Sequence, residues 1–283
     1  MTEYLQKFMP ILSSEKAFII DQLNGIVHIL MFILIIGWGM FFIYCLIRFS
    51  KKNNPKANYH GVTNHYSSYA EYAIVGFEVL ILIGFAIPGY NSLKYEEVYN
   101  TNHDLEVRVV AQQFAWNIHY PGSDGKFGTT RLSLVDEETN PLGIDRAGYG
   151  ADDITTLNQL HLPVDKQVKI YISSKDVIHS FSLPEMRVKQ DAVPGMQIPI
   201  YFTPTMTSKE FLKEIEGSSR IGYIEGISTS GGYEIACAQL CGNSHYKMRG
   251  FMTIHSEKEY EQWLIDQLEY LDSEGEDDWD DDW

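Results

Sequence analysis

Four residues with sulfur or imidazole side chains lie close together near the end of the chain. In the stretch CAQLCGNSHYKM they are Cys237, Cys241, His245 and Met248. Two thiolates, an imidazole and a thioether form a soft ligand set, which favours copper over magnesium or calcium, the cations that take oxygen ligands. The stretch therefore predicts a copper site.

Zinc, a single copper ion or a disulfide would each use fewer of these residues. Structural zinc sites use two Cys pairs or a Cys2His2 set at tighter spacing and do not recruit methionine. A mononuclear blue-copper site needs one cysteine. A Cys237–Cys241 disulfide would leave His245 and Met248 without a role, and no CxxCH haem motif occurs. A further nitrogen ligand must come from elsewhere, and His179 ends an apolar run upstream, although by itself it is typical of an ordinary strand-end histidine.

The surrounding sequence predicts a β domain that positions these ligands, over residues 100–256. Short alternating runs such as LEVRVVAQ, QVKIYISS and MQIPIYFT are bounded by Gly, Pro, Asn or Asp, and their period of two favours a sandwich or barrel. Residues 121–153 and 205–232 lack this periodicity, so we expect surface excursions, the second with a short helix at SKEFLKEIEG.

The end of the chain predicts a helix and then a tail. Residues 257–271 have apolar side chains at helical spacing, and Ser256 with Glu259 forms a capping box before them. Residues 272–283 are acidic without a basic residue, which predicts a disordered acidic tail. With the formal net charge of −16, a nucleic-acid partner is excluded, because phosphate binding needs clustered Lys and Arg.

Two apolar segments predict a transmembrane hairpin that anchors the domain. The span at 22–48 has no acidic, Lys or Arg residue from Gln22 to Ile47, and the span at 69–94 contains Glu78 and a Pro88-Gly89 pair that kinks or ends the helix. The intervening loop, 49–68, carries most of the nearby positive charge. The positive-inside rule makes it cytoplasmic and puts residues 1–21 and the β domain outside.

The N-terminal region also indicates the membrane. Its apolar run starts late and is too long for a cleaved signal, and the segment is not the Arg- and Ser-rich, acid-poor stretch of a transit peptide. We therefore expect the inner (cell) membrane of a bacterium, with membrane lipid around the hairpin.

A hairpin followed by a β domain ending in CxxxCxxxHxxM resembles subunit II of cytochrome c oxidase, a haem–copper oxidase. Two stretches carry the resemblance, DVIHSFSLPEMRVKQDAVPG and CAQLCGNSHYKMRG. It implies a cupredoxin-like sandwich with a binuclear copper centre, CuA, that takes electrons from a c-type cytochrome, separate or complex-bound. The electrons pass to the haems of subunit I, where oxygen is reduced to water with proton translocation, so no catalytic residue is expected in this chain.

The resemblance also implies the copper ligands, with Cys237 and Cys241 bridging the two ions. One ion would add His179 and Met248, and the other would add His245 and the main-chain carbonyl of Gln239. Many members of the family carry Glu in place of Gln239, with a side chain that reaches magnesium at the border with subunit I. The Gln leaves magnesium binding through this residue open.

Three further residues match family positions. In AQQFAWNIHY, Phe114 and Trp116 correspond to the aromatic cluster through which electrons arrive, with Phe in place of the usual Trp. Glu71 corresponds to the carboxylate at the mouth of a proton-uptake channel, although an acid at a helix start also favours the helix dipole. Glu78 has no family counterpart, and an intramembrane acid usually faces a partner or water.

Two related classes are alternatives. Quinol-oxidase subunits share the fold without copper and lack the Cys, His or Met ligands, all of which are present here. A copper carrier or a nitrous-oxide-reductase-like protein would share the binuclear site, but the latter needs a large additional catalytic domain and no hairpin of this kind.

Overall fold

The computed structural model describes residues 9–56, 59–60, 64–91, 103–216 and 232–277, and it describes the side chains of the last helix as far as residue 271. The chain forms two compact units, one of residues 19–100 and the other of residues 1–18 with 101–283. The first unit holds the helical hairpin and the second holds the β domain.

Two helices of the hairpin are long and apolar enough to cross a membrane, Ala17–Arg48 and Tyr66–Tyr90. The first, α2, begins at Ala17 rather than at residue 22, and the second begins at Tyr66 rather than at residue 69. Residues 92–94 of the predicted second span lie outside the described residues. Most of the large apolar side chains of both helices are exposed, as expected where lipid forms the surroundings.

The second span stays helical through Pro88, where the sequence predicted a kink or an end. It consists of α3 (Tyr66–Ile81), a π-helical turn, η1 (Leu82–Ala86), and α4 (Ile87–Tyr90). Proline has no N–H to donate to the preceding turn. A wide π turn directly before it accommodates the missing hydrogen bond without ending the helix.

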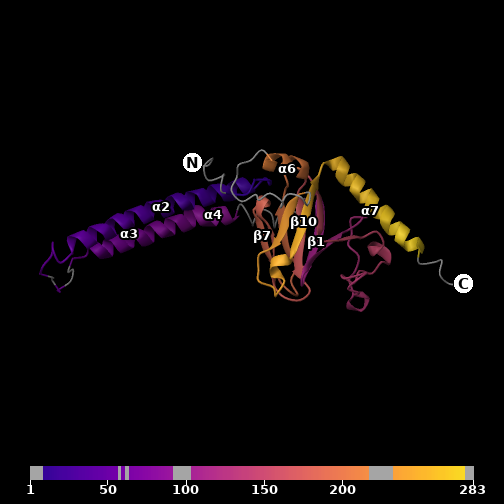
Figure 1. Ribbon diagram of the computed structural model, residues 1–283, viewed down its shortest axis with the longest axis horizontal. Helices are drawn as coiled ribbons and strands as arrows, with labels where there is room; N and C mark the ends of the chain where they lie inside the picture. Colours follow the sequence, from indigo (N-terminus) through magenta and orange to yellow (C-terminus); the bar gives the residue numbers. More distant parts are fainter. Residues whose placement is uncertain (1–8, 57–58, 61–63, 92–102, 217–231, 278–283) are drawn as a thin grey trace. The chain divides into compact units, whose positions relative to one another are not determined.

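The β domain is a sandwich of two five-stranded sheets (Figure 1). The first sheet has the order β3 (Ile154–Leu157), β2 (Ala115–Tyr120), β1 (Leu105–Gln112), β5 (Val168–Ser174), β8 (Ile198–Phe202). The second has the order β4 (Gln159–Pro163), β10 (Arg249–His255), β9 (Tyr233–Cys237), β6 (His179–Leu183), β7 (Val188–Ala192). The sandwich predicted from alternating runs is confirmed.

Two strand pairs are parallel, β1 with β5 and β10 with β4, and the others are antiparallel. Parallel neighbours need a crossover connection. The chain supplies one by visiting β4 in the second sheet between β3 and β5 of the first. This exchange between sheets makes the two layers interdependent.

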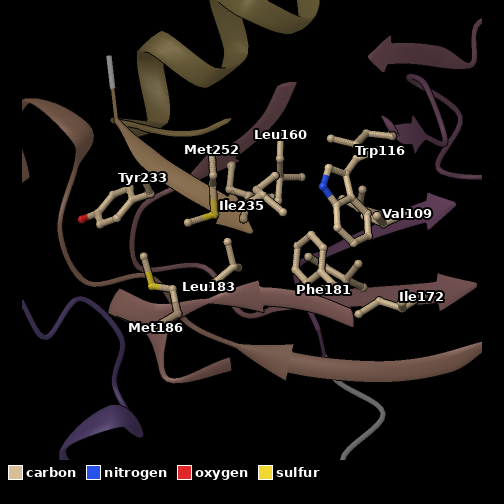
Figure 2. Packing of buried hydrophobic residues seen from close by; sticks show 14 of the residues in the cluster. Val109, Trp116, Leu160, Ile172, Phe181, Leu183, Met186, Tyr233, Ile235 and Met252 are labelled. Carbon is tan, nitrogen blue, oxygen red and sulfur yellow. The ribbon is translucent and has the colours of Figure 1, made fainter. Parts of the chain in front are cut away.

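Alternate side chains of both sheets fill the core between them (Figure 2). Trp116 of β2 meets Phe181 of β6 edge to face, with ring centroids 5.5 Å apart, and both rings are fully buried. Such contacts add to the hydrophobic stabilisation of burial. Because Phe181 lies two residues after His179, the core fixes the strand from which that histidine projects.

The long connection between β2 and β3 is a surface excursion, as its composition predicted. It contains short 3-10 turns at η3 (Leu132–Leu134) and η4 (Gly148–Gly150). At its end Asp153 lies 2.5 Å from His119 Nε2, and both side chains are buried. Burial lowers the pKa of His119, although the adjacent carboxylate opposes this effect. In the other predicted excursion α6 covers Ser208–Glu216, and residues 217–231 lie outside the described residues.

The C-terminal helix α7 covers Glu257–Asp277 and so continues beyond the predicted end at residue 271. Ser256 caps it, because its N–H and hydroxyl both donate to Glu259 Oε2, at 3.1 and 2.8 Å. The half of the predicted capping box in which the Glu259 side chain accepts the Ser256 N–H is therefore present. The expected acidic tail is corrected over residues 272–277, which are helical, and residues 278–283 lie outside the described residues.

The segment before α2 is part of the β domain, which the sequence did not predict. Ile11 is 1% exposed and belongs to the sandwich core. Ser13 N–H donates to the Glu185 carbonyl at 3.0 Å, and Ser14 forms a β-bridge with Pro204. Burying an isoleucine stabilises a domain by about 2 kcal/mol. The sandwich is thus completed by residues from both sides of the hairpin.

Candidate metal centre

The predicted ligands come from neighbouring strands of the second sheet. His179 starts β6 and Cys237 ends β9, and these strands pair with Phe181 opposite Cys237. The chain then turns through Cys241 and a 3-10 turn, η7 (His245–Lys247), and enters β10 directly after Met248. Because β6 begins and β9 ends at the same end of the sheet, residues far apart in sequence lie close together.

Each ligand atom of five predicted residues lies within 4.0 Å of at least one other. The two Sγ atoms of Cys237 and Cys241 are 3.8 Å apart. Cys241 Sγ lies 3.6 Å from His245 Nδ1 and 3.8 Å from Met248 Sδ. His179 Nδ1 lies 3.1 Å from Met248 Sδ and 4.0 Å from Cys237 Sγ. A bonded disulfide needs about 2.05 Å, so both cysteines are free.

The main-chain oxygen of Gln239 also faces the site. It lies 3.3 Å from Cys237 Sγ, while the Gln239 side chain is exposed. Burial, with the neighbouring thiol of Cys237, raises the pKa of the Cys241 thiol to about 11. Without a cation the Cys241 thiol therefore stays protonated, whereas a soft cation would stabilise its thiolate.

Asp176 fixes the orientation of His179 through the ring nitrogen that does not face the sulfur atoms. His179 is fully buried, and its Nε2 lies 2.9 Å from Asp176 Oδ1. An Nε2–H that donates to this carboxylate leaves the Nδ1 lone pair facing the sulfur atoms, as in carboxylate–histidine–metal arrangements. The pKa of Asp176 is lowered, because hydrogen bonds from His179 and from main-chain N–H groups outweigh the opposing effect of partial burial.

The donor set fits copper. Among the described residues, one group of three or more His, Cys, Asp and Glu side chains has its ligand atoms within 4.8 Å, namely His179, Cys237 and Cys241. A metal about 2.3 Å from each sulfur can touch both cysteines at their separation. With imidazole and thioether donors added, the chemistry matches a soft metal that cycles between oxidation states.

Relatives of the chain are subunits of cytochrome c oxidases. Residues 105–212 match the family of the cytochrome c oxidase subunit II periplasmic domain. The "Alternative cytochrome c oxidase subunit 2" of Bradyrhizobium diazoefficiens is 30% identical over 240 residues, which cover 83% of this chain and 76% of that protein. The chain belongs to the cytochrome c oxidase subunit II family. Subunit II proteins are part of haem–copper oxidases, and this chain is accordingly an oxidase subunit.

Two further similarities are with another bacterial oxidase subunit and with a solved periplasmic domain. The cytochrome c oxidase subunit 2 of Cereibacter sphaeroides is 28% identical over 268 residues, covering 89% of this chain and 77% of that protein. The crystal structure of the periplasmic domain of subunit II of cytochrome oxidase from Bradyrhizobium japonicum has 24% sequence identity and a TM-score of 0.39, covering 60% of this chain and 97% of that one.

The two aromatic residues assigned to electron arrival have different surroundings. Trp116 is fully buried, with its ring centroid 6.2 Å from that of His179. Phe114 is half-buried and packs against the core cluster, and its ring faces Gly242 in the cysteine loop. Of the two rings, that of Phe114 reaches solvent.

Glu71 and Glu78 both lie on α3, within the second span. They are seven positions apart, which puts them on one face of the helix, about 10 Å apart along its axis. The seven-residue spacing that gives this shared face is present in the sequence.

Sequence reasoning missed two residues at the centre, Asp176 and Gln113. Asp176 stands three positions before His179 in DVIHS, and a carboxylate at that spacing was the available signal. Gln113 donates to the site from the end of β1, in the other sheet. No local pattern reveals a contact between sheets.

Proposed function

We propose that this chain is the electron-accepting subunit of a respiratory haem–copper terminal oxidase. Electrons from a c-type cytochrome would pass through a binuclear copper centre to the haems of subunit I, where oxygen is reduced to water and protons are translocated. The observation that carries the proposal is the pair of free cysteine sulfurs 3.8 Å apart, flanked by imidazole and thioether donors.

Cys237 and Cys241 would bridge the two ions, and each ion would have two further ligands. These are His179 Nδ1 with Met248 Sδ, and His245 Nδ1 with the Gln239 carbonyl. The bound copper pair would accept and return one electron shared over both ions. The protein buries one side of this cage, because His179 and Met248 are 0% and 1% exposed, whereas Cys237 and His245 are half-buried. Two paired strands hold His179 and Cys237 in place.

The two apolar spans support the proposal that the chain has a partner in the membrane. Ile11, before the first helix, and the sandwich, after the second, share one core, so the chain returns to the side from which it started. With the basic loop on the cytoplasmic side, the copper domain would face outward from a bacterial inner membrane. The hairpin would contact subunit I and lipid, and Glu71 would take up protons from the cytoplasmic side.

The cytochrome would dock near Phe114. The formal net charge of −16 favours a basic partner through electrostatic steering, which accelerates association. The chain's own residues supply the acceptor and its surroundings, and the haems and the oxygen chemistry belong to subunit I.

The decisive experiment is to load the full-length chain with copper in detergent and record metal content and the electron paramagnetic resonance spectrum. The full chain is needed because Ile11 completes the core. Two coppers per chain, with one unpaired electron shared by both nuclei, would support the proposal. A single copper, zinc, or a Cys237–Cys241 disulfide in folded protein would defeat it, and zinc or the disulfide would favour a copper-free structural subunit.

A further inference from the structure

Two adjacent glutamines at the end of β1 have different surroundings. Gln112 Oε1 accepts hydrogen bonds from Asn117 Nδ2 and from Lys175 Nζ, the neighbour of Asp176, both at 3.0 Å. Gln113 contacts both loops that carry predicted copper ligands. The pair therefore offers one residue type in two environments.

The main chain of Gln113 is bound to the histidine loop. Its N–H donates to Asp176 Oδ2 at 2.7 Å, while the other oxygen of the same carboxylate lies 2.9 Å from His179 Nε2. One carboxylate thus links the segment before Phe114 to the imidazole, and hydrogen bonds to an ionised acceptor are stronger than neutral ones.

The side chain of Gln113 is bound to the cysteine loop. Its Nε2 donates to the carbonyl of Cys241 at 2.6 Å. Gly242 follows directly, with φ +137°, and a Cβ there would lie 2.8 Å from Gln113 Nε2 and 3.1 Å from Phe114 Cζ. Only glycine leaves room for so close an approach. Phe114 is thus pressed against the backbone that carries Cys241.

We propose that Gln113 is a positioning residue that holds Phe114 against the two ligand loops. It acts through its main-chain bond to Asp176 and its amide bond to the Cys241 carbonyl, so that the aromatic ring exposed to a docking cytochrome stays in contact with the metal cage. The proposal rests on the proposed function, in which Phe114 lies where electrons arrive.

The test uses the full-length chain and two variants. Gln113→Met keeps the side-chain length and removes the amide donor to the Cys241 carbonyl. Gln112→Met makes the same change at a neighbouring amide, which bonds Lys175 in the histidine loop and has no hydrogen bond to the cysteine loop among the described residues. Amide hydrogen exchange of the peptides around Phe114 and Gly242 is measured without copper. With copper, the metal content, the paramagnetic resonance spectrum and the rate of electron uptake from a reduced soluble c-type cytochrome are measured.

We expect Gln113→Met to keep two coppers, to exchange both peptides about tenfold faster, and to lower the limiting rate of electron uptake by about tenfold, the equivalent of one typical hydrogen bond. Its half-saturating cytochrome concentration should stay the same, and Gln112→Met should match the wild type.

Equal exchange and equal limiting rates in the two variants would overturn the inference, as would loss of copper or of the fold in Gln113→Met alone. A wild type without paired coppers defeats the proposed function instead, and the exchange comparison still decides whether Gln113 holds the loops together.

Discussion

The two ends of the second sheet each gather two histidines and an aromatic ring, with opposite chemical outcomes. Where β10 begins, the nitrogens of His179 and His245 face sulfur atoms. Where β10 ends, His161 Nδ1 lies 2.8 Å from His255 Nε2, and Trp263 of α7 stacks on His161 with centroids 4.4 Å apart.

The difference lies in what satisfies each nitrogen. An imidazole pair completes its own hydrogen bond with one N–H and one lone pair. A sulfur atom is a weak partner, so a nitrogen that faces sulfur keeps its lone pair for a cation. Histidine clusters alone therefore do not indicate a metal site in this molecule, and the following predictions test the distinction.

The largest effect is expected from Cys241→Ser. Loss of one bridging sulfur should abolish the paired-copper spectrum and leave at most one copper per chain, because the hard hydroxyl does not replace a soft thiolate. Metal analysis and electron paramagnetic resonance measure this. Cys45→Ser, in the membrane helix α2, should change neither quantity. Two coppers retained in Cys241→Ser would contradict the assignment.

The histidine pair at the other end predicts a pH dependence of stability. Burial, and then the neighbouring His255, lower the pKa of His161 from 6.5 to about 4. The unfolded chain therefore binds more protons between these values. The contribution of His161 is complete above about pH 6.5 and is lost as the pH falls toward 4. It amounts to about 2 to 3 kcal/mol of unfolding free energy.

Denaturant unfolding of the copper-free chain in detergent, followed by circular dichroism between pH 7 and 4.5, measures this slope. His161→Gln should flatten it, because the amide does not titrate. The nearby Glu259 has its pKa lowered to about 2 by hydrogen bonds with Lys209 and Ser256, so it adds little in this range. An equal slope in both proteins would refute the prediction.

A smaller effect is expected where a carboxylate supports the metal end. Asp176→Asn should weaken copper binding by about 10- to 100-fold, because an amide is a poorer acceptor for His179 Nε2–H. Competition with a copper chelator measures the affinity. Asp165→Asn is the matched control, since Asp165 is exposed at a turn with φ 58°, a conformation that asparagine tolerates. Equal affinities for the two variants would show that Asp176 does not support the histidine.

The smallest effect is expected at the cap of α7. Ser256→Ala should cost about 1 kcal/mol of unfolding free energy, because the hydrogen bond from the hydroxyl to Glu259 Oε2 in the first turn is lost. Ser256 lies beside His255, at the end of the sheet opposite the predicted copper ligands, so the copper content should stay the same. A changed paramagnetic resonance spectrum in this variant would show that the two ends of the sheet are coupled.

Periodicity and local spacing were sufficient for several elements. The alternating runs predicted the sandwich strands, Ser256 and Glu259 predicted the cap, and the charge-free run predicted the first membrane helix. Each of these depends on neighbours in sequence. Pro88 did not end the second helix, because a π turn accommodates it, and α7 passed residue 271, since backbone hydrogen bonds can extend a helix into acidic sequence.

The sequence by itself determined the chemistry of this protein: two cysteines, two histidines and a methionine in an order that favours copper, behind two apolar spans. Only the tertiary structure decided which further residues serve that chemistry. Gln113 and Ile11 acquire their roles through contacts across sheets or across the whole hairpin, and Asp176, a sequence neighbour of His179, is linked to the other sheet by the Gln113 N–H. Side-chain type is written in the sequence, whereas a contact between distant segments exists only after the core has brought them together.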